Sequence, residues 1–113
     1  MKKNNNNIIG VNLKPIENID RVVHEPARFL ILAYLYVVKK ADFLFLLRQT
    51  NLTRGNLSSH LNKLEAARYV KIEKRFVDKI PRTRIFITEK GRKAFHTYKQ
   101  NLTAILEKLP GSK

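Results

Sequence analysis

The chain has 113 residues, of which 43% are hydrophobic and 28% charged, enough apolar material for one globular domain. Lysine and arginine number 23 against 9 acidic residues, so the net charge is +14, and such an excess predicts an anionic partner, either nucleic acid or a membrane surface. Cysteine is absent, which excludes disulfides and thiolate metal sites, and the lack of a signal peptide or a long apolar run predicts a cytoplasmic protein.

Residues 1–14 are predicted to form an N-terminal tail that is disordered or extended. The first seven residues, MKKNNNN, are polar and of low complexity, so they have little apolar surface to bury. After Pro15, four apolar residues at helical spacing predict a short amphipathic helix over residues 16–23. A helix this short is unstable alone, so it should pack on another element. The four residues are Ile16, Ile19, Val22 and Val23.

Residues 29–38 are apolar on nearly every side and predict a central core helix. Pro26 suits the first turn of this helix, where its missing N–H costs nothing. Lys39 and Lys40 should close the helix, because positive charge is favourable at the negative end of the helix dipole. His24 precedes the helix, and we predict that it is a capping or surface residue and not a metal ligand.

Residues 42–70 (DFLFLLRQTNLTRGNLSSHLNKLEAARYV) predict a helix, a short turn and a second helix. Asp42 is the expected N-cap of the first helix, which should end near Thr50 and Asn51. Thr53 is the expected N-cap of the second helix. The leucines of that helix recur at intervals of four and three residues and should form one buried stripe. They are Leu57, Leu61 and Leu64.

The opposite side of the second helix is unusual for a solvent-exposed surface. It carries short hydrogen-bonding side chains and a glycine, and its first acidic residue is Glu65. Such side chains can approach base edges and phosphates closely, and the lack of carboxylates avoids repulsion by phosphate. The pattern favours a DNA-binding surface, although an ordinary helical hairpin would also fit it. The residues away from the stripe are Gly55, Asn56, Ser59, Asn62 and Lys63, with Arg54, Ser58 and His60 on the flanks.

Two stretches with alternating apolar and polar residues, 70–76 (VKIEKRF) and 83–87 (TRIFI), predict a pair of strands. Residues 77–82 between them contain a proline and basic residues, so they should form a loop with Lys79, Pro81 and Arg82 at its tip. A two-stranded hairpin is not stable alone. We therefore expect this hairpin to lean on the helices.

The last predicted helix has Thr88 as its N-cap, runs to about Lys108 and ends before Pro110. Apolar residues alternate along it at three- and four-residue intervals, which is the pattern of a heptad seam. This seam either folds back on the domain or pairs with a second copy, and the helix length favours pairing, hence a homodimer. The seam residues are Phe95, Tyr98, Leu102, Ile105 and Leu109.

This order of elements resembles the winged helix-turn-helix transcriptional regulators, close to the MarR-like and ArsR-like groups. Three stretches carry the likeness: HEPARFLILAYL (24–35), LTRGNLSSHLNKLEAARYV (52–70) and RTRIFITEKGRKAF (82–95). The resemblance covers about residues 19–106. It implies an α+β fold, mainly α with a small β-hairpin, in which terminal helices flank the winged helix-turn-helix. It also implies that the second helix enters the major groove of double-stranded DNA and that the hairpin is the wing, on the backbone or minor groove.

Two features depart from these relatives. The absence of cysteine excludes the thiolate metal sensing of the arsenical-type repressors. Arg68 stands where relatives commonly have a glycine after the second helix, which should either alter the turn into the first wing strand or add a phosphate contact.

We therefore divide the chain into a tail (1–14), a winged helix-turn-helix domain (15–88) and a dimerisation helix (89–113). The residues expected to contact DNA are Thr53, Arg54, Asn56, Ser58, Ser59, His60, Asn62, Lys63, Arg75, Lys79, Arg82 and Arg84. Those expected at the dimer interface are Ile16, Ile19, Val23, Phe95, Tyr98, Leu102, Ile105 and Leu109. His60 is expected to hydrogen-bond either DNA or the wing.

The sequence predicts neither an enzyme nor a bound metal or cofactor. It lacks a phosphate-binding glycine loop and a nucleophile with a matched base, and its three histidines lack zinc-ligand spacing. The expected partners are DNA and a second copy of the chain, with a small-molecule effector left open. The alternatives are a protein that coats DNA without sequence preference and a winged helix that binds other proteins. A membrane role is disfavoured, because no helix pairs a broad apolar face with a lysine-rich one.

Overall fold

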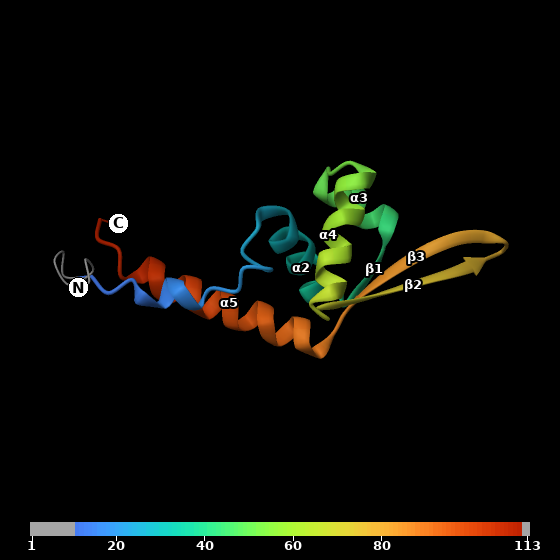
Figure 1. Cartoon of the computed structure of the whole chain (residues 1–113). Helices are drawn as coiled ribbons and strands as arrows, with labels where there is room; N and C mark the ends of the chain where they lie inside the picture. The colour runs from blue at the N-terminus through green and yellow to red at the C-terminus, as the bar shows by residue number, and fades with distance from the viewer. Residues whose placement is uncertain (1–10, 112–113) are drawn as a thin grey trace.

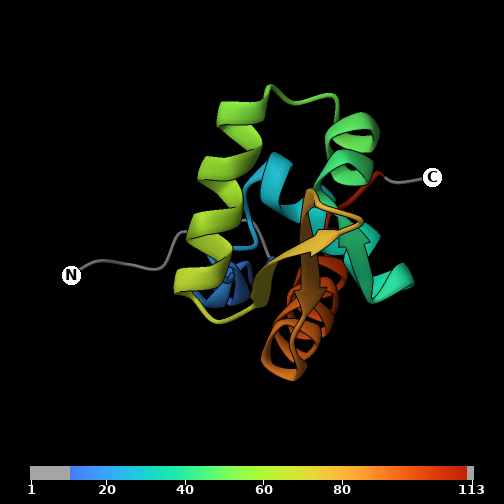
Figure 2. The ribbon, with the colours of Figure 1, turned by 90° about the vertical axis from the view of Figure 1, so that its right-hand side faces the viewer.

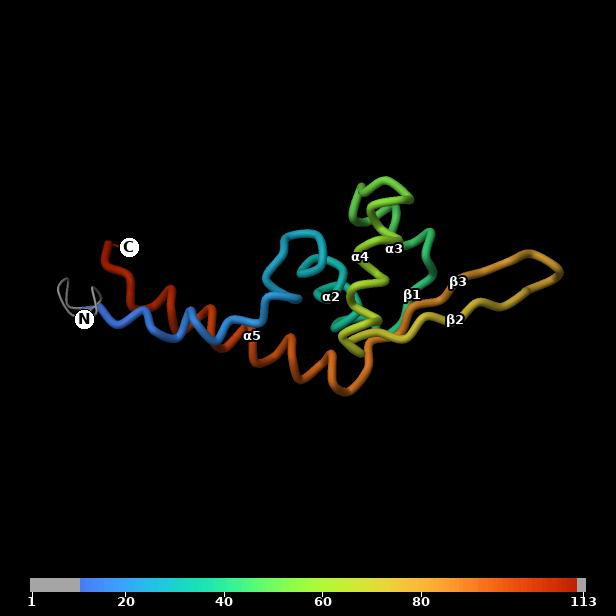
Figure 3. Tube along the Cα trace, viewed as in Figure 1, coloured from blue at the N-terminus to red at the C-terminus, as the bar shows by residue number. Residues whose placement is uncertain are grey.

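The computed structural model describes residues 11–111. The molecule is elongated, with principal extents of 63 × 31 × 24 Å, and a hairpin projects from one end while the first and last described residues lie at the other (Figures 1 and 3). The predicted α+β fold is confirmed. In chain order the elements are the 3-10 helix η1 (Lys14–Asn18), α2 (Pro26–Val38), β1 (Lys40–Asp42), α3 (Phe43–Thr50), α4 (Arg54–Ala66), β2 (Val70–Val77), β3 (Ile80–Ile87) and α5 (Glu89–Glu107).

Short polar residues determine where α3 ends and where α4 and α5 begin. Asn51 adopts a left-handed conformation (φ 58°) and ends α3, as predicted. The hydroxyl of Thr53 accepts a hydrogen bond from the N–H of Asn56 (3.1 Å) at the start of α4. The hydroxyl of Thr88 accepts one from the N–H of Gly91 (2.9 Å) at the start of α5. Both threonine caps confirm the predictions.

α2 is the central core helix, as predicted. Its Ile31, Leu32 and Leu35 are fully buried, although Val37 near its end is 78% exposed. α3, α4 and β3 pack on α2 and bury their own apolar residues against it. The predicted leucine stripe of α4 is confirmed. The buried residues from these three elements are Leu46, Leu57, Leu61, Leu64 and Ile85.

The hairpin belongs to a three-stranded antiparallel sheet of order β1-β3-β2. The sequence did not predict β1, because a three-residue strand is too short to show alternation. In β1, Lys40 pairs with Phe86 and Asp42 pairs with Arg84. The prediction that two lysines close α2 is therefore wrong for Lys40, while Lys39 does cap the helix in a positive-φ conformation (φ 74°).

The wing, which we define as β2, β3 and their turn, spans the predicted residues 70–87, but its strands are longer and its loop is shorter than predicted. Its loop consists of Asp78 and Lys79, both with positive φ (51° and 66°), as a two-residue hairpin turn matched to the strand twist requires. Pro81 and Arg82, which we predicted in the loop, lie in β3. Pro81 is tolerated there because β1 pairs only with residues 84–86, so the missing N–H breaks no ladder bond on that side.

The prediction of an amphipathic helix over residues 16–23 is wrong. η1 ends at Asn18, and the chain then turns around Asp20, whose carboxylate accepts hydrogen bonds from the N–H groups of Val22 (2.8 Å) and Val23 (3.2 Å). Such a local side-chain turn competes with helix. The apolar residues of this stretch also do not share one face, because Val23 is buried whereas Ile16 is 56% exposed.

α5 packs along η1 and α2, and these contacts cover most of its apolar seam (Figure 1). Phe95, Tyr98 and Ile105 are each at most 6% exposed within a single chain. Phe95 stacks on Phe29 of α2, with 5.4 Å between the ring centroids. Most of the seam therefore folds back on its own domain, which is the alternative that the helix length disfavoured, because the N-terminal segment and α2 cover it. Only its last member, Leu109, is clearly exposed (41%).

Candidate nucleic-acid interface

α4 and the wing lie next to each other at one end of the molecule. In Figure 2 the wing comes toward the reader and α4 stands beside it. Every wing residue from 74 to 82 is exposed, so the outer half of the hairpin touches little else in the chain. This end therefore presents a helix and a projecting hairpin together, which is the arrangement that the sequence predicted.

The side of α4 that faces away from the core is polar and open. Asn56, Ser59 and Asn62 are exposed, and so is Lys63. Their side chains are therefore available to a partner. Thr53 is also exposed, but its hydroxyl already accepts the capping hydrogen bond, so its first role is to fix where α4 begins.

A groove of about 340 Å³ separates α4 from the wing. α4 lines it with Arg54, Ser58 and Asn62, which are spaced four residues apart and so share one side of the helix. Lys74 of β2 lines the facing wall. The sequence analysis missed Lys74, although its position two residues after Ile72, hence on the same strand face, could have identified it.

A second cleft, of about 380 Å³, lies between α3, the start of α4 and β3. Its lining residues include Arg48, Arg54 and Arg82 together with Asp42, whose carboxylate is acidic. That carboxylate pairs with both Arg82 and Arg84, each at 3.6 Å. These pairs are partly exposed and therefore weak, so a phosphate can compete with Asp42 for Arg82. The sequence analysis missed Arg48, because this cleft forms only where α3 meets the sheet.

The remaining predicted wing residues differ in their surroundings. Arg75 and Lys79 are exposed on the outer half of the hairpin. The side chain of Arg84 is only 30% exposed and lies beside Asp42 at the base of the sheet. Arg84 is therefore better placed to fix the sheet against the start of α3 than to reach a ligand.

His60 does not face the wing. Its Nδ1 lies 3.2 Å from a guanidinium nitrogen of Arg28 and 3.8 Å from the carboxylate of Glu25, both at the start of α2. The prediction of a contact between His60 and the wing is wrong, because the rotation of α4 that buries Leu61 turns the histidine toward α2. A DNA contact by His60 stays a prediction.

Arg68 adopts a left-handed conformation (φ 67°) between α4 and β2. That conformation favours glycine, which accounts for the glycine that the resembled regulators commonly have there. Its carbonyl accepts a hydrogen bond from the hydroxyl of Thr88 (2.7 Å), so the turn is held against the start of α5. The side chain of Arg68 is exposed.

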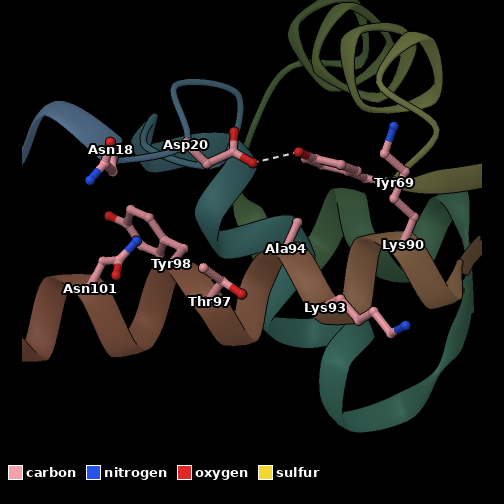
Figure 4. A pocket seen from close by; sticks show the side chains of 9 residues that line it. All are labelled: Asn18, Asp20, Tyr69, Lys90, Lys93, Ala94, Thr97, Tyr98 and Asn101. Carbon is pink, nitrogen blue, oxygen red and sulfur yellow. Dashed lines mark hydrogen bonds between the residues drawn. The ribbon is translucent and has the colours of Figure 1, made fainter. Parts of the chain in front are cut away.

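A hollow of about 430 Å³ lies between the N-terminal segment, Tyr69 and α5 (Figure 4). On one wall the hydroxyl of Tyr69 donates a hydrogen bond to the carboxylate of Asp20. Burial, and to a lesser degree this bond and the negative charge of Asp20, raise the pKa of Tyr69 from 10.0 to about 12. The hydrogen bond of Tyr69 connects the N-terminal segment to the link between α4 and the wing.

Tyr98 of α5 makes a similar connection. Burial raises the pKa of the Tyr98 hydroxyl, which lies 2.9 Å from Nδ1 of His24. His24 is exposed and contacts α5 through this bond, in agreement with its prediction as a surface residue. Across residues 11–111, the structure contains neither a cluster of three metal-ligating side chains nor a helix long and apolar enough to cross a membrane.

A family model described as a winged helix DNA-binding domain matches residues 27–106. The chain therefore belongs to the winged helix DNA-binding domain family, which confirms the resemblance found in the sequence. An uncharacterized protein of Methanocaldococcus jannaschii is 40% identical over 78 residues, which are 69% of this chain and 85% of that protein.

Solved structures agree with this assignment. A transcriptional regulator homologue from Pyrococcus horikoshii OT3 matches with a TM-score of 0.82 and 30% identity, covering 87% of this chain and 99% of that one. A MarR-family transcriptional regulator from Silicibacter pomeroyi matches with a TM-score of 0.61 over 90% of this chain and 68% of that one. At 20% identity this second likeness shows the fold alone.

Proposed function

We propose that this winged helix protein is a transcriptional regulator that binds specific sites in double-stranded DNA as a homodimer. α4 enters the major groove, and the wing contacts the backbone or minor groove beside it. The observation that carries the proposal is the groove between α4 and the wing. Its lining residues include Arg54, Ser58, Asn62 and Lys74. The groove lies at the end from which the wing projects, and the protein has a net charge of +14. A surface of this kind matches base edges and phosphates together.

The two elements have different roles in this proposal. The exposed amides and hydroxyls of α4, at Asn56, Ser59 and Asn62, contact base edges and so determine the preferred sequence. The cations at Lys74 and Lys79 of the wing contact phosphates, which position the protein but carry no sequence information.

The homodimer is proposed to form at the end opposite to the wing. Three apolar side chains are exposed where η1 packs beside the last turns of α5: Ile16 (56%), Leu106 (54%) and Leu109 (41%). Association of two copies through this end would remove them from water. A two-fold dimer would present its two α4 helices to successive major grooves, about 34 to 36 Å apart, and therefore requires a palindromic site.

Selection of binding sites from random double-stranded DNA tests the proposal. The wild type should enrich a two-fold symmetric motif, whereas no enrichment would favour the alternative of a protein that coats DNA without sequence preference. Asn56→Ala with Ser59→Ala should weaken binding to the selected duplex more than binding to random DNA. Lys74→Ala with Lys79→Gly, which preserves the positive φ of the turn, should weaken both about equally. If the two double variants behave alike, the division of roles between α4 and the wing is wrong.

A further inference from the structure

The tip of the wing is apolar, although nothing else in the described chain covers it. Phe76 is 74% exposed, Ile80 is 53% exposed and Val77 is 39% exposed, and Pro81 is exposed as well. The two-residue turn of Asp78 and Lys79 does not require apolar neighbours. Clustered apolar side chains in such an exposed place indicate a contact with another molecule.

The strand register groups two of these residues. Val77 and Ile80 close the two-residue turn as a hydrogen-bonded pair. Phe76 and Pro81 form the next pair, which is not hydrogen-bonded, and side chains on opposite strands are closest in pairs of this kind. Phe76 and Pro81 therefore make one continuous apolar wedge. Val77 and Ile80 point to the opposite face of the hairpin, because successive residues of a strand alternate.

The wedge lies on the face of the wing that looks toward α4. Ile72 and Lys74 of the same strand face line the groove beside α4, and Phe76 follows two residues later along β2. A ligand that fills this groove and continues along the hairpin would therefore reach Phe76 and Pro81 next.

The charges around the wedge indicate what that ligand is. Lys74 lies on the same face of the wing as the wedge, and Lys79 lies in the turn beside it. Arg75 and Arg82 form the neighbouring pair on the opposite face, where Arg82 also pairs with Asp42. All four basic side chains are exposed, and the nearest acids along the hairpin are Asp78 and Glu73. An apolar tip on a hairpin whose exposed charged side chains are mostly basic fits a polyanion that also offers apolar surface. Double-stranded DNA has both, because its phosphates flank the stacked faces of its bases.

We propose that Phe76, backed by Pro81, inserts as a wedge at a base step in the minor groove beside the site bound by α4, and bends the DNA there. This inference rests on the proposed function and extends it. Apolar wedges of this kind partly unstack a step and bend the duplex by about 20° to 90°. Such bending favours flexible pyrimidine–purine steps, so the wedge contributes specificity at positions that α4 does not touch.

The test measures DNA bending by energy transfer between dyes at the two ends of a duplex of about 30 base pairs that carries the selected motif. The wild type should shorten the end-to-end distance. Phe76→Ala should lose at least half of that change and weaken binding about tenfold, as expected for one lost stacking contact. Phe76→Leu should restore part of the bend, because leucine is also an apolar wedge. Val77→Ala is the matched control on the opposite face, and it should bend DNA like the wild type.

Three outcomes would overturn the wedge: equal bending by wild type and Phe76→Ala, an equal loss in Val77→Ala, or a change in the sedimentation of DNA-free protein on Phe76→Ala. The last outcome would show that Phe76 contacts protein instead of DNA. A wild type that enriches a motif but leaves the duplex straight contradicts the wedge alone, whereas a wild type that enriches no motif contradicts the proposed function.

Discussion

α4 and α5 are both amphipathic helices whose apolar residues recur every three or four positions, but their outer surfaces differ. α4 buries Leu57, Leu61 and Leu64 and leaves a polar side open beside the wing. α5 also buries most of its apolar seam within the chain, yet Leu106 in its last turn and Leu109 just beyond its end are exposed. The periodicity alone predicted that each helix has an apolar face and did not indicate which surface covers it.

The two helices lie toward opposite ends of the molecule (Figure 1), and the two ends expose different kinds of side chain. The end with α4 and the wing is open and basic and carries the apolar tip of the wing, whereas the apolar side chains exposed at the end with η1 and the last turns of α5 are Ile16, Leu106 and Leu109. Salt screens contacts between charged groups, whereas association through apolar side chains is driven by their removal from water. DNA binding and dimerisation should therefore differ in their salt dependence, and experiments can measure them separately.

The largest expected effect is that of salt on DNA binding. If the dimer contacts about 6 to 10 phosphates, raising salt from about 50 to about 200 mM should lower DNA affinity roughly 10³- to 10⁵-fold, because bound counterions are released. Dimerisation through the apolar end should change by less than about threefold over the same range, since apolar contacts are not screened. Fluorescence anisotropy with a labelled duplex and sedimentation equilibrium measure the two constants. DNA affinity that stays flat across this range would contradict the DNA interface.

The next largest effect concerns the stability change on replacing a glycine by alanine in α5 and in α4. A Cβ on Gly91 of α5 would lie 2.1 Å from the carbonyl oxygen of Tyr69, so Gly91→Ala should lower the free energy of unfolding by about 3 kcal/mol through overpacking against backbone. Gly55→Ala of α4 is the matched control. Nothing lies within 4 Å of its added Cβ, and alanine is the better helix former, so stability should rise by up to about 1 kcal/mol. Denaturant unfolding measures both changes, and similar effects at the two glycines would refute the packing assigned to the start of α5.

The proposed dimer interface gives a third prediction. Leu106→Glu with Leu109→Glu should raise the dimer dissociation constant by at least about a hundredfold, because each buried leucine contributes about 1.5 to 3 kcal/mol and the variant removes two from each copy. The chain should stay folded, since both side chains are exposed in the monomer. Val37→Glu is the control, because Val37 is an apolar residue near the end of α2 that is even more exposed (78%) than the two leucines. Sedimentation velocity measures the association state. A dimer that tolerates the change at α5 but not at Val37 would place the interface on α2.

Replacement of Ile105 would not be a clean test of the dimer. Ile105 is only 6% exposed within one chain, so a charge there should unfold the monomer before it reports on association.

The smallest predicted effect concerns Tyr69, which connects the two ends through Asp20. Its pKa is about 12 in the folded chain against 10.0 for a free tyrosine. The protonated form is favoured by folding, so its contribution to stability is complete below pH 10 and is lost as the pH rises from 10 to 12. Tyr69→Phe lacks this ionisation, so the difference in unfolding free energy between wild type and variant should shrink across that range. Denaturant titrations at several alkaline pH values test this, and a constant difference would contradict the raised pKa that burial and Asp20 give Tyr69.

The sequence by itself determined what depends on neighbouring residues in the chain. Thr53 and Thr88 cap helices through hydrogen bonds three residues away, and the leucine stripe of α4 follows from helical geometry. The polar side of α4 and the charge of +14 were equally visible, so the DNA-binding class was predictable.

Only the tertiary structure decided which surfaces meet. It covered the seam of α5 with the N-terminal segment and α2, added β1 to the sheet, and placed His60 against Arg28 instead of the wing. These outcomes depend on contacts between residues far apart in the chain. Periodicity defines the direction of a side chain only relative to its own helix or strand, so it carries no information about the partner that packing brings to that face.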